Sequence, residues 1–358
     1  MSSSHAIKRA VLSELARYPF RPDPWLRGPH RQTLWGPALR WPPPLPTRLE
    51  HWPTPDGDRL RLHVHGGRVD QPMALLLHGL EGSADAWYIR ALGLALTAQG
   101  WGIVALDYRS CGGEMNHARR LYHLGETGDV DHVVRRMAER WPQRALCLAG
   151  FSMGANLVLK WLGEQGDAAP AQVVAAAAVS APFDLTACAY HLHRGIGHGY
   201  VLNFMRTLIP KALAKERQYP GCVERERVKG CRSFFAYDAC VTAPLHGFRD
   251  LGDYWKSCSC RHYLTGVRRP VLIISAADDP FTPPEVLPHA LADRSPFLHN
   301  LFVPHGGHCG FVHVNGRGVE PWAQSQILRF LARYTDAEPR ADAAPNVQVM
   351  AAGRAGVG

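Results

Sequence analysis

The sequence predicts an α/β protein with a mostly parallel central sheet, helices on both faces and an inserted cap region. Short, fully apolar runs alternate with segments of helical periodicity up to about residue 181, the order typical of a parallel sheet covered on both sides. At residues 144–160, one of these runs leads through a glycine-bearing turn directly into a helical pattern. The regular order breaks at Pro182 and returns at Pro270, which indicates an insertion.

Composition and charge narrow the class of protein. The chain can bury a full core, because it has 358 residues of which 46% are hydrophobic. Its formal charge of +9 comes from 40 basic and 31 acidic residues, but the basic residues are scattered. Nucleic-acid-binding proteins usually carry a basic stripe and a recognition motif, and we find no such motif, so no nucleic-acid partner is expected. A basic surface leaves peripheral contact with an anionic membrane open.

Cysteine usage and hydropathy predict a cytoplasmic protein. The nine cysteines have irregular spacing, unlike the disulfide framework of a small secreted domain, and are expected to be reduced thiols. The N-terminal stretch lacks the apolar run of a signal peptide. No run of about 18 apolar residues occurs, so no transmembrane helix is expected. No feature of the sequence indicates the oligomeric state.

Residues 1–47 are predicted to form a proline-rich arm. Eight prolines lie between residues 20 and 47, a density incompatible with long helices or central strands. The next segment predicts a β-hairpin, because a turn at Asp56-Gly57 precedes a stretch with apolar residues at alternate positions.

Residues 48–181 hold the first part of the predicted core. After the hairpin, the expected strands are short apolar runs at residues 73–77, 101–106, 145–149 and 173–179. The helices between them have apolar residues at helical spacing and lie at residues 86–99, 128–141 and from 155 onward.

Residues 182–265 are predicted to be the cap insertion, and residues 266–336 the second part of the core. That second part has two strands and a closing helix, expected at residues 270–277, 298–303 and 321–334. Residues 337–358 are rich in Ala, Gly and Pro and are predicted to form a disordered tail. In the insertion, Tyr200–Leu213 is interpreted as a helix packed on the core, with a roof over an acyl-chain pocket or a lipid contact as the alternative.

The pentapeptide Gly150-Phe151-Ser152-Met153-Gly154 matches the G-x-S-x-G nucleophile elbow. In this motif a strand leads through a sharp turn into a helix, the turn strains the serine backbone, and small flanking residues allow close approach. The apolar run before the pentapeptide and the helical spacing after it supply that context. Ser152 is therefore the candidate nucleophile, and a glycine-flanked serine at a helix N-cap is the alternative.

Serine catalysis also needs a base and a carboxylate that orients the base, and on such a sheet they follow the serine at later strand ends, acid first. Asp278 and Asp279 follow one apolar strand, and His308 follows the next. Asp278 is preferred because it is the first residue beyond its strand, and Asp279 is the alternative. His308 is preferred over His305 because its Gly-Gly-His turn lets the backbone bring the imidazole over the nucleophile.

A candidate oxyanion hole follows the strand at residues 73–77. A glycine-bearing loop at this place, here His78-Gly79-Leu80, can aim a backbone N–H at the site. We choose Leu80 as the first donor and Met153, the residue after the nucleophile, as the second. The alternative is that the loop only makes a tight turn.

Eight segments carry a specific resemblance. They are HRQTLWGPALR at 30–40, HGLEGS at 78–83, DYRSCGGEMN at 107–116, GETGDVDHVV at 125–134, GFSMGAN at 150–156, TAPLHGFRDLGDYW at 242–255, AADDPF at 276–281 and HGGHCGF at 305–311. Together they resemble the YheT-like branch of the α/β-hydrolase superfamily, over about residues 20 to 335. The resemblance implies the α/β-hydrolase fold, a charge relay of Ser152, Asp278 and His308, and an esterase or lipase for short to medium acyl chains, in some members of glycerolipids or phospholipids.

The sequence as a whole predicts a serine hydrolase that cleaves small acyl esters through an acyl-enzyme, without a cofactor. A thioesterase or phospholipase would use the same triad, and a noncatalytic binding protein on the same scaffold is the alternative outside the enzymes. Cys258, Cys260 and His262 lack the paired C-x-x-C spacing of zinc sites, so no metal is expected.

Overall fold

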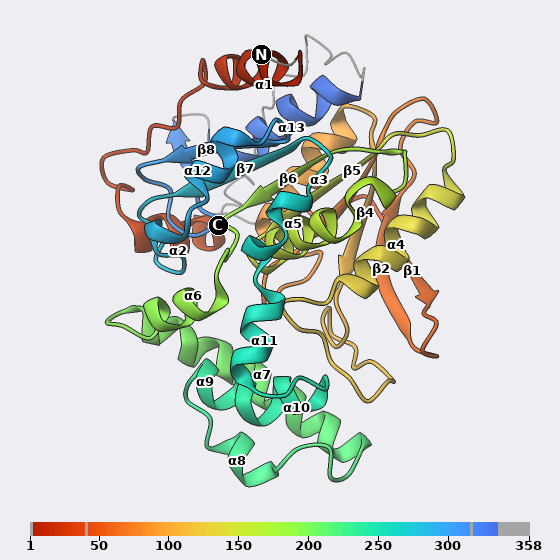
Figure 1. Ribbon diagram of the computed structural model, residues 1–358, viewed down its shortest axis with the longest axis vertical. Helices are drawn as coiled ribbons and strands as arrows, with labels where there is room; N and C mark the ends of the chain where they lie inside the picture. Colours follow the sequence, from red (N-terminus) through yellow and green to blue (C-terminus); the bar gives the residue numbers. More distant parts are fainter. Residues whose placement is uncertain (1–2, 40–41, 316–317, 336–358) are drawn as a thin grey trace, which may run out of the picture.

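The computed structural model describes residues 3–39, 42–315 and 318–335, and it is built around an eight-stranded sheet in the order β1-β2-β4-β3-β5-β6-β7-β8 (Figure 1). The strands are β1 (Arg48–Pro53), β2 (Arg59–His65), β3 (Met73–Leu77), β4 (Gly102–Asp107), β5 (Leu146–Phe151), β6 (Val173–Val179), β7 (Val271–Ala276) and β8 (Leu298–Val303). β2 runs antiparallel to its neighbours β1 and β4, and every pairing from β4 onward is parallel. The predicted mostly parallel sheet is thus confirmed.

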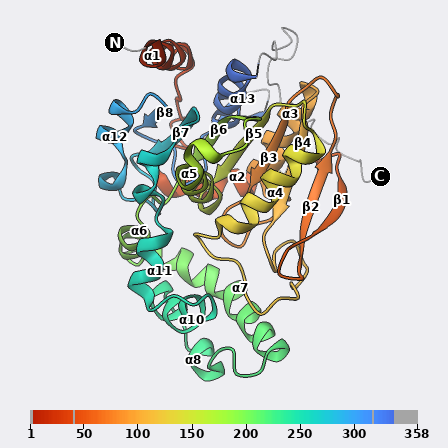
Figure 2. The ribbon, with the colours of Figure 1, turned by 45° about the vertical axis from the view of Figure 1, so that its right-hand side comes forward.

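Helices cover both faces of the sheet (Figure 2). α3 (Trp87–Ala98) and α13 (Trp322–Tyr334) pack together on one face, and α4 (Thr127–Arg140) and α5 (Met153–Gln165) on the other. In β3, Leu75 and Leu77 pack into the apolar cluster under α4 and α5, whereas Ala74 and Leu76 pack under α3 and α13. Since successive side chains alternate between two covered faces, the strand is apolar at every position.

The predicted core elements are present, and the expected strands at 173–179 and 298–303 coincide with β6 and β8. In the second part of the core, three elements were not predicted: α12 (His289–Arg294) beside β8, and a two-stranded sheet of β9 (Val312–Asn315) and β10 (Gly318–Pro321). The predicted tail at 337–358 lies outside the described residues.

The arm differs from the prediction. α1 (Ser3–Leu15) packs on α13, and α2 (Pro29–Leu39) is an 11-residue helix within the proline-rich stretch. The expectation that this stretch contains no long helix is therefore wrong. Pro29 is the first residue of α2, where a missing N–H removes no intrahelical hydrogen bond.

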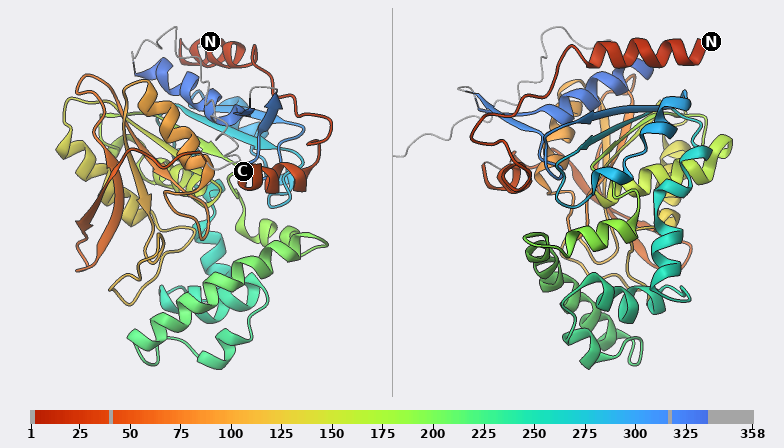
Figure 3. Two further views of the ribbon diagram at one scale, coloured as in Figure 1. Left: turned by 180° about the vertical axis from the view of Figure 1, so that it is seen from behind. Right: turned by 60° about the vertical axis from the view of Figure 1, so that its left-hand side comes forward.

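Six helices form a layer of their own beyond the carboxyl ends of the parallel strands, and we call them the cap helices (Figure 1, Figure 3). They are α6 (Leu185–Leu192), α7 (Gly197–Gln218), α8 (Arg225–Lys229), α9 (Phe234–Tyr237), α10 (Ala243–Leu245) and α11 (Leu251–Cys258). On α7, Val201, Met205, Leu208 and Ala212 recur at helical spacing and are buried in an apolar cluster of the cap helices. Among the described residues, no helix combines the length and apolar character needed to cross a membrane.

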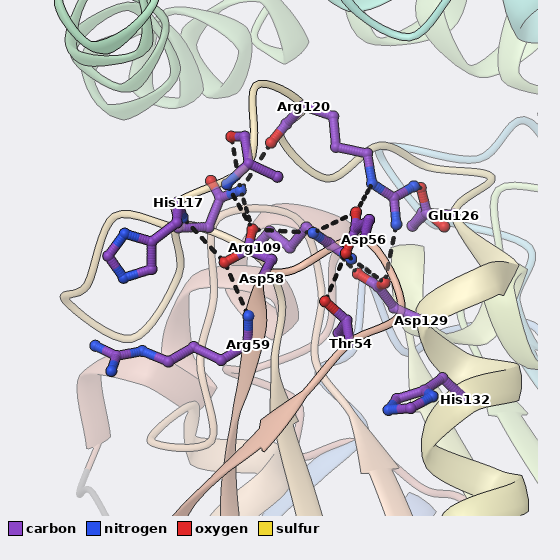
Figure 4. Close-up of polar contacts among 12 residues, drawn as sticks. Thr54, Asp56, Asp58, Arg59, Arg109, His117, Arg120, Glu126, Asp129 and His132 are labelled. Atoms are coloured by element: carbon purple, nitrogen blue, oxygen red, sulfur yellow. Dashed lines mark hydrogen bonds and ion pairs between the residues drawn. The ribbon is translucent and has the colours of Figure 1, made fainter.

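A buried carboxylate holds the loop on which the cap helices rest (Figure 4). Asp58 accepts hydrogen bonds from Arg109 Nη1 at 2.9 Å, from Asn116 Nδ2 at 2.7 Å and from the backbone N–H groups of His117 and Ala118 at 3.0 and 2.9 Å. Burial alone would raise the pKa of Asp58, but these hydrogen bonds outweigh it and hold the pKa well below its usual range.

The same loop receives a lysine from α7. The Nζ of Lys215 donates to the carbonyl oxygens of Asn116 and Ala118, each at 2.8 Å, and the side chain is fully buried. Burial lowers the pKa of Lys215 to about 8. The hairpin of β1 and β2, the loop and α7 are thus joined through Asp58 and Lys215.

Candidate active site

Ser152 stands on the sharp turn between β5 and α5, with φ of 54° and ψ of −118°. A non-glycine residue rarely adopts a positive φ, so the surrounding structure holds this backbone in place. A Cβ added at Gly150 would lie 2.2 Å from the carbonyl oxygen of Gly154, and one added at Gly154 would lie 2.3 Å from that of Leu77. Both glycines are required by this close approach, and the predicted strand, turn and helix are confirmed.

Three side chains from distant parts of the chain form one line of hydrogen bonds. His308 Nε2 lies 2.8 Å from Ser152 Oγ, and His308 Nδ1 lies 2.9 Å from Asp279 Oδ2. Asp279 Oδ1 also accepts the backbone N–H groups of Phe281 and Thr282, at 2.8 and 3.3 Å, which fixes the carboxylate. In this arrangement His308 donates from Nδ1 to Asp279, which leaves Nε2 free to accept the hydroxyl proton of Ser152.

Asp278 does not contact His308, so our preference for it as the partner of His308 is wrong. Its Oδ2 lies 3.2 Å from His305 Nδ1, and its Oδ1 accepts the backbone N–H of Gly307 at 3.0 Å. β7 ends at Ala276, and a turn closed by the Asp279 N–H on the Ala276 carbonyl follows it. This turn brings the second aspartate, and not the first, to His308.

The imidazole of His308 is buried between the acid and an aromatic ring. Phe281 stacks on it with a centroid distance of 4.0 Å and an interplanar angle of 12°. Burial alone would lower the pKa of His308, but the charge and hydrogen bond of Asp279 outweigh it, and the pKa is raised. The carboxylate of Asp279 therefore stabilises a positive charge on the imidazole of His308.

Two further residues line a cavity together with Ser152. Leu80 and Met153 line the same cavity as Ser152, and neither N–H donates to another residue in the part of the chain that the structure describes. The loop before Leu80 is fixed, because the N–H of Gly79 donates to Tyr88 Oη at 3.0 Å. His78 is fully buried, which lowers its pKa to about 4 and keeps its ring neutral at physiological pH.

A comparison with known proteins agrees with this geometry. The family model described as serine aminopeptidase, S33 matches residues 71–307. The chain is 33% identical over 289 residues to the putative esterase YheT of Escherichia coli (strain K12), covering 79% of this chain and 84% of that protein. The chain belongs to the α/β-hydrolase family. The resemblance of its motifs to the YheT-like branch is confirmed.

Other relatives of this α/β-hydrolase include phospholipase ABHD3 of Mus musculus, which is 29% identical over 327 residues, covering 89% of this chain and 78% of that protein. Among solved structures, the Pyrococcus furiosus esterase Pf2001 superimposes with a TM-score of 0.54 at 17% identity, covering 81% of this chain and 94% of that one. At this identity the structural similarity supports the fold.

An apolar cavity adjoins Ser152 of this α/β-hydrolase. Leu80 and Met153 line it from the core, and the cap helices contribute most of the rest of its wall, including Leu185, Leu192, Phe204, Phe234 and Trp255. The cavity extends to Asp238, whose carboxylate accepts hydrogen bonds from Thr242 Oγ1 at 2.6 Å and Trp255 Nε1 at 3.0 Å. Burial raises the pKa of Asp238 to about 6.

Sequence reasoning missed two supports of the site. Thr33 on α2 accepts the backbone N–H of His308 at Oγ1, at 2.9 Å, and Ser180 Oγ accepts that of Cys309 at 3.0 Å. The family segment at residues 30–40 includes Thr33, so a signal was present, but it carried no chemical role. Neither Ser180 nor Asp238 lies in a motif that marks it as functional.

Proposed function

We propose that this protein hydrolyses carboxylic esters through an acyl-enzyme, with Ser152, His308 and Asp279 as its triad. Ser152 Oγ attacks the ester carbonyl while His308 takes its proton, and His308 then returns that proton to the leaving alcohol. Water attacks the acyl-enzyme in the same way and releases the acid. The observation that carries the proposal is the 2.8 Å contact between Ser152 Oγ and His308 Nε2, together with the carboxylate of Asp279 on the other ring nitrogen.

The negative charge of the tetrahedral intermediate needs two donors beside Ser152. The N–H groups of Leu80 and Met153 are proposed as the oxyanion hole, because both border the cavity and neither has another partner among the described residues. Such donors stabilise the transition state most when they are already in place before the reaction. The fixed loop at Gly79 supports this role for Leu80.

The apolar cavity is proposed as the acyl pocket, and residues 182–265 as the cap that covers it. A wall of leucine and aromatic side chains suits an acyl chain of short to medium length. Relatives named phospholipase ABHD3 and, in Saccharomyces cerevisiae, monoacylglycerol lipase support a glycerolipid as the substrate class. A thioester or phospholipid would be cleaved by the same groups.

The cysteines support a cytoplasmic location. All nine are free and buried. Buried thiols at irregular spacing fit a compartment in which cysteines stay reduced.

The test combines a fluorophosphonate probe with nitrophenyl esters of increasing acyl length. The folded wild type should be labelled and should turn over esters, and Ser152→Ala should lose labelling and lower kcat at least about a thousandfold. Ser13→Ala, an exposed substitution on α1, serves as the matched control and should behave as the wild type. Equal labelling of Ser152→Ala and the wild type would exclude Ser152 as the nucleophile, and a folded wild type that neither reacts nor turns over would favour a binding protein.

A further inference from the structure

Exposed apolar side chains lie on the arm and on the first two cap helices. Trp25 and Leu34 belong to the arm, and Leu34, on α2, is 56% exposed. Tyr190 lies on α6 and Ile196 at the turn between α6 and α7. Ile196 is 69% exposed, although burial is the usual state of an isoleucine. We call these four residues the edge surface.

The two halves of the edge surface meet at one contact. His30 Nδ1 on α2 lies 3.0 Å from Tyr200 Oη on α7, and the two rings stack. Leu34 follows His30 by one turn of α2, and Ile196, which directly precedes α7, lies four residues before Tyr200. Both residues are therefore close to this contact. The views in Figures 1 and 3 agree that α2 lies next to the junction of α6 and α7.

The edge surface adjoins the reaction centre. The ring of Tyr200 packs against Phe281 with centroids 4.9 Å apart, and Phe281 stacks on His308. Thr33, the neighbour of Leu34 on α2, accepts the backbone N–H of His308. Tyr200 and Phe281 thus connect the edge surface to the imidazole of His308 through two successive ring contacts.

The segments that carry the edge surface are basic, which favours a negatively charged binding partner. Residues 24–49 and 185–215 contain no Asp or Glu. Exposed arginines occupy both segments, and in the part of the chain that the structure describes none of the following takes part in an ion pair: Arg27, Arg31, Arg194 and Arg206. Apolar side chains surrounded by unpaired arginines are the combination that binds an anionic lipid–water interface.

We propose that the edge surface docks on an anionic membrane, so that an ester lipid passes from the bilayer to Ser152. The delivery of substrate rests on the proposed ester hydrolysis, whereas the docking itself does not. A second copy of the chain fits less well, because a symmetric dimer through this surface would bring its arginines against each other.

The experiment measures binding of the full chain to lipid vesicles by sedimentation, with salt as a second variable. Wild-type protein should bind vesicles of phosphatidylcholine and phosphatidylglycerol in equal amounts more tightly than vesicles of phosphatidylcholine alone, and added salt should weaken the binding. Ile196→Ser should weaken it roughly tenfold, and Arg194→Gln roughly fivefold. Val69→Ser removes an 89% exposed side chain between β2 and β3, at the opposite end of the strands, and should have no effect.

Turnover of a dissolved short ester separates docking from chemistry. The Ile196 and Arg194 variants should hydrolyse nitrophenyl butyrate at the wild-type rate while losing activity on the same vesicles. Absence of wild-type binding, an equal loss in Val69→Ser, or a dimer in solution that Ile196→Ser dissociates would each overturn the docking proposal. Binding without hydrolysis of any ester would leave docking in place and refute the proposed function.

Discussion

His308 has two neighbouring aspartates within its reach along the chain, and only one of them faces it. Asp279 Oδ2 lies 2.9 Å from His308 Nδ1, while Asp278 is occupied by His305 and the N–H of Gly307. We expect Asp279→Asn to lower kcat by about 10⁴-fold, because the ring loses the group that fixes its tautomer. Asp278→Asn should cost only a few-fold. Steady-state kinetics on nitrophenyl butyrate, with a thermal melt of each variant, measure the difference, and equal losses would contradict the assignment.

The same pair of variants has a second readout in the pH profile. The negative charge of Asp279 stabilises the imidazolium and raises the pKa of His308, so kcat/KM should rise with pH as the ring loses its proton. Removing the charge lowers that pKa, so the rising limb of Asp279→Asn should move to lower pH. Asp278→Asn should keep the wild-type limb, and a limb that moves in this variant alone would assign the relay to Asp278.

At this site, some residues could be chosen from the sequence and others could not. Ser152 and His308 were identified because a glycine-bearing turn and a strand end restrict where their side chains can point. The choice between Asp278 and Asp279 depends on the turn after β7, which is closed by one backbone hydrogen bond and leaves no trace in composition. Asp238 was missed for a related reason, since its burial arises from the packing of cap helices that are distant in sequence.

At the scale of elements, the elbow depends on the absence of side chains at two positions. Gly150→Ala would place a Cβ 2.2 Å from a backbone oxygen of α5, and backbone atoms cannot move aside without separating β5 from that helix. We expect a loss of stability of at least about 3 kcal/mol, measured by denaturant unfolding, and loss of probe labelling. Gly199→Ala is the control, because a Cβ there meets nothing within 4 Å, and it should stabilise α7 by up to about 1 kcal/mol. Normal stability of Gly150→Ala would contradict the close approach at the elbow.

The inner strands β3 to β7 could be predicted because they are buried on both faces and are apolar at nearly every position. The helix α2 could not be predicted, because a high density of prolines usually indicates a segment without helices. Pro29 is compatible with α2 because it is the first residue of the helix. The short helices between Arg225 and Cys258 are likewise too brief to show a clear periodicity. Helices α8 to α10 are arranged by the apolar cluster that they build with α7, and α11 by the cluster that it builds with α6.

For the whole molecule, Asp58 joins the sheet to the cap helices through the loop in Figure 4. Asp58→Asn should lower the free energy of unfolding by about 3 kcal/mol, because it leaves Arg109 without one of its buried carboxylates. The folded-state pKa of Asp58 lies below its unfolded value, so its stabilisation is complete above the unfolded pKa, near about 4, and is lost as the pH falls further. Denaturant unfolding of the wild type and Asp58→Asn should give a large difference in the free energy of unfolding at pH 7 and a small one in acid. A difference that does not change with pH would contradict this role.

The contact between α2 and the turn that carries His308 determines which truncated fragments of the chain keep the site intact. The span shared with the family model ends at residue 307, one position before His308, and begins well after Thr33. A recombinant fragment or chimera trimmed to that span would lack the imidazole that contacts Ser152 and the hydroxyl that accepts the backbone N–H of His308. A fragment that is to keep this arrangement therefore has to begin upstream of Pro29 and extend through α13.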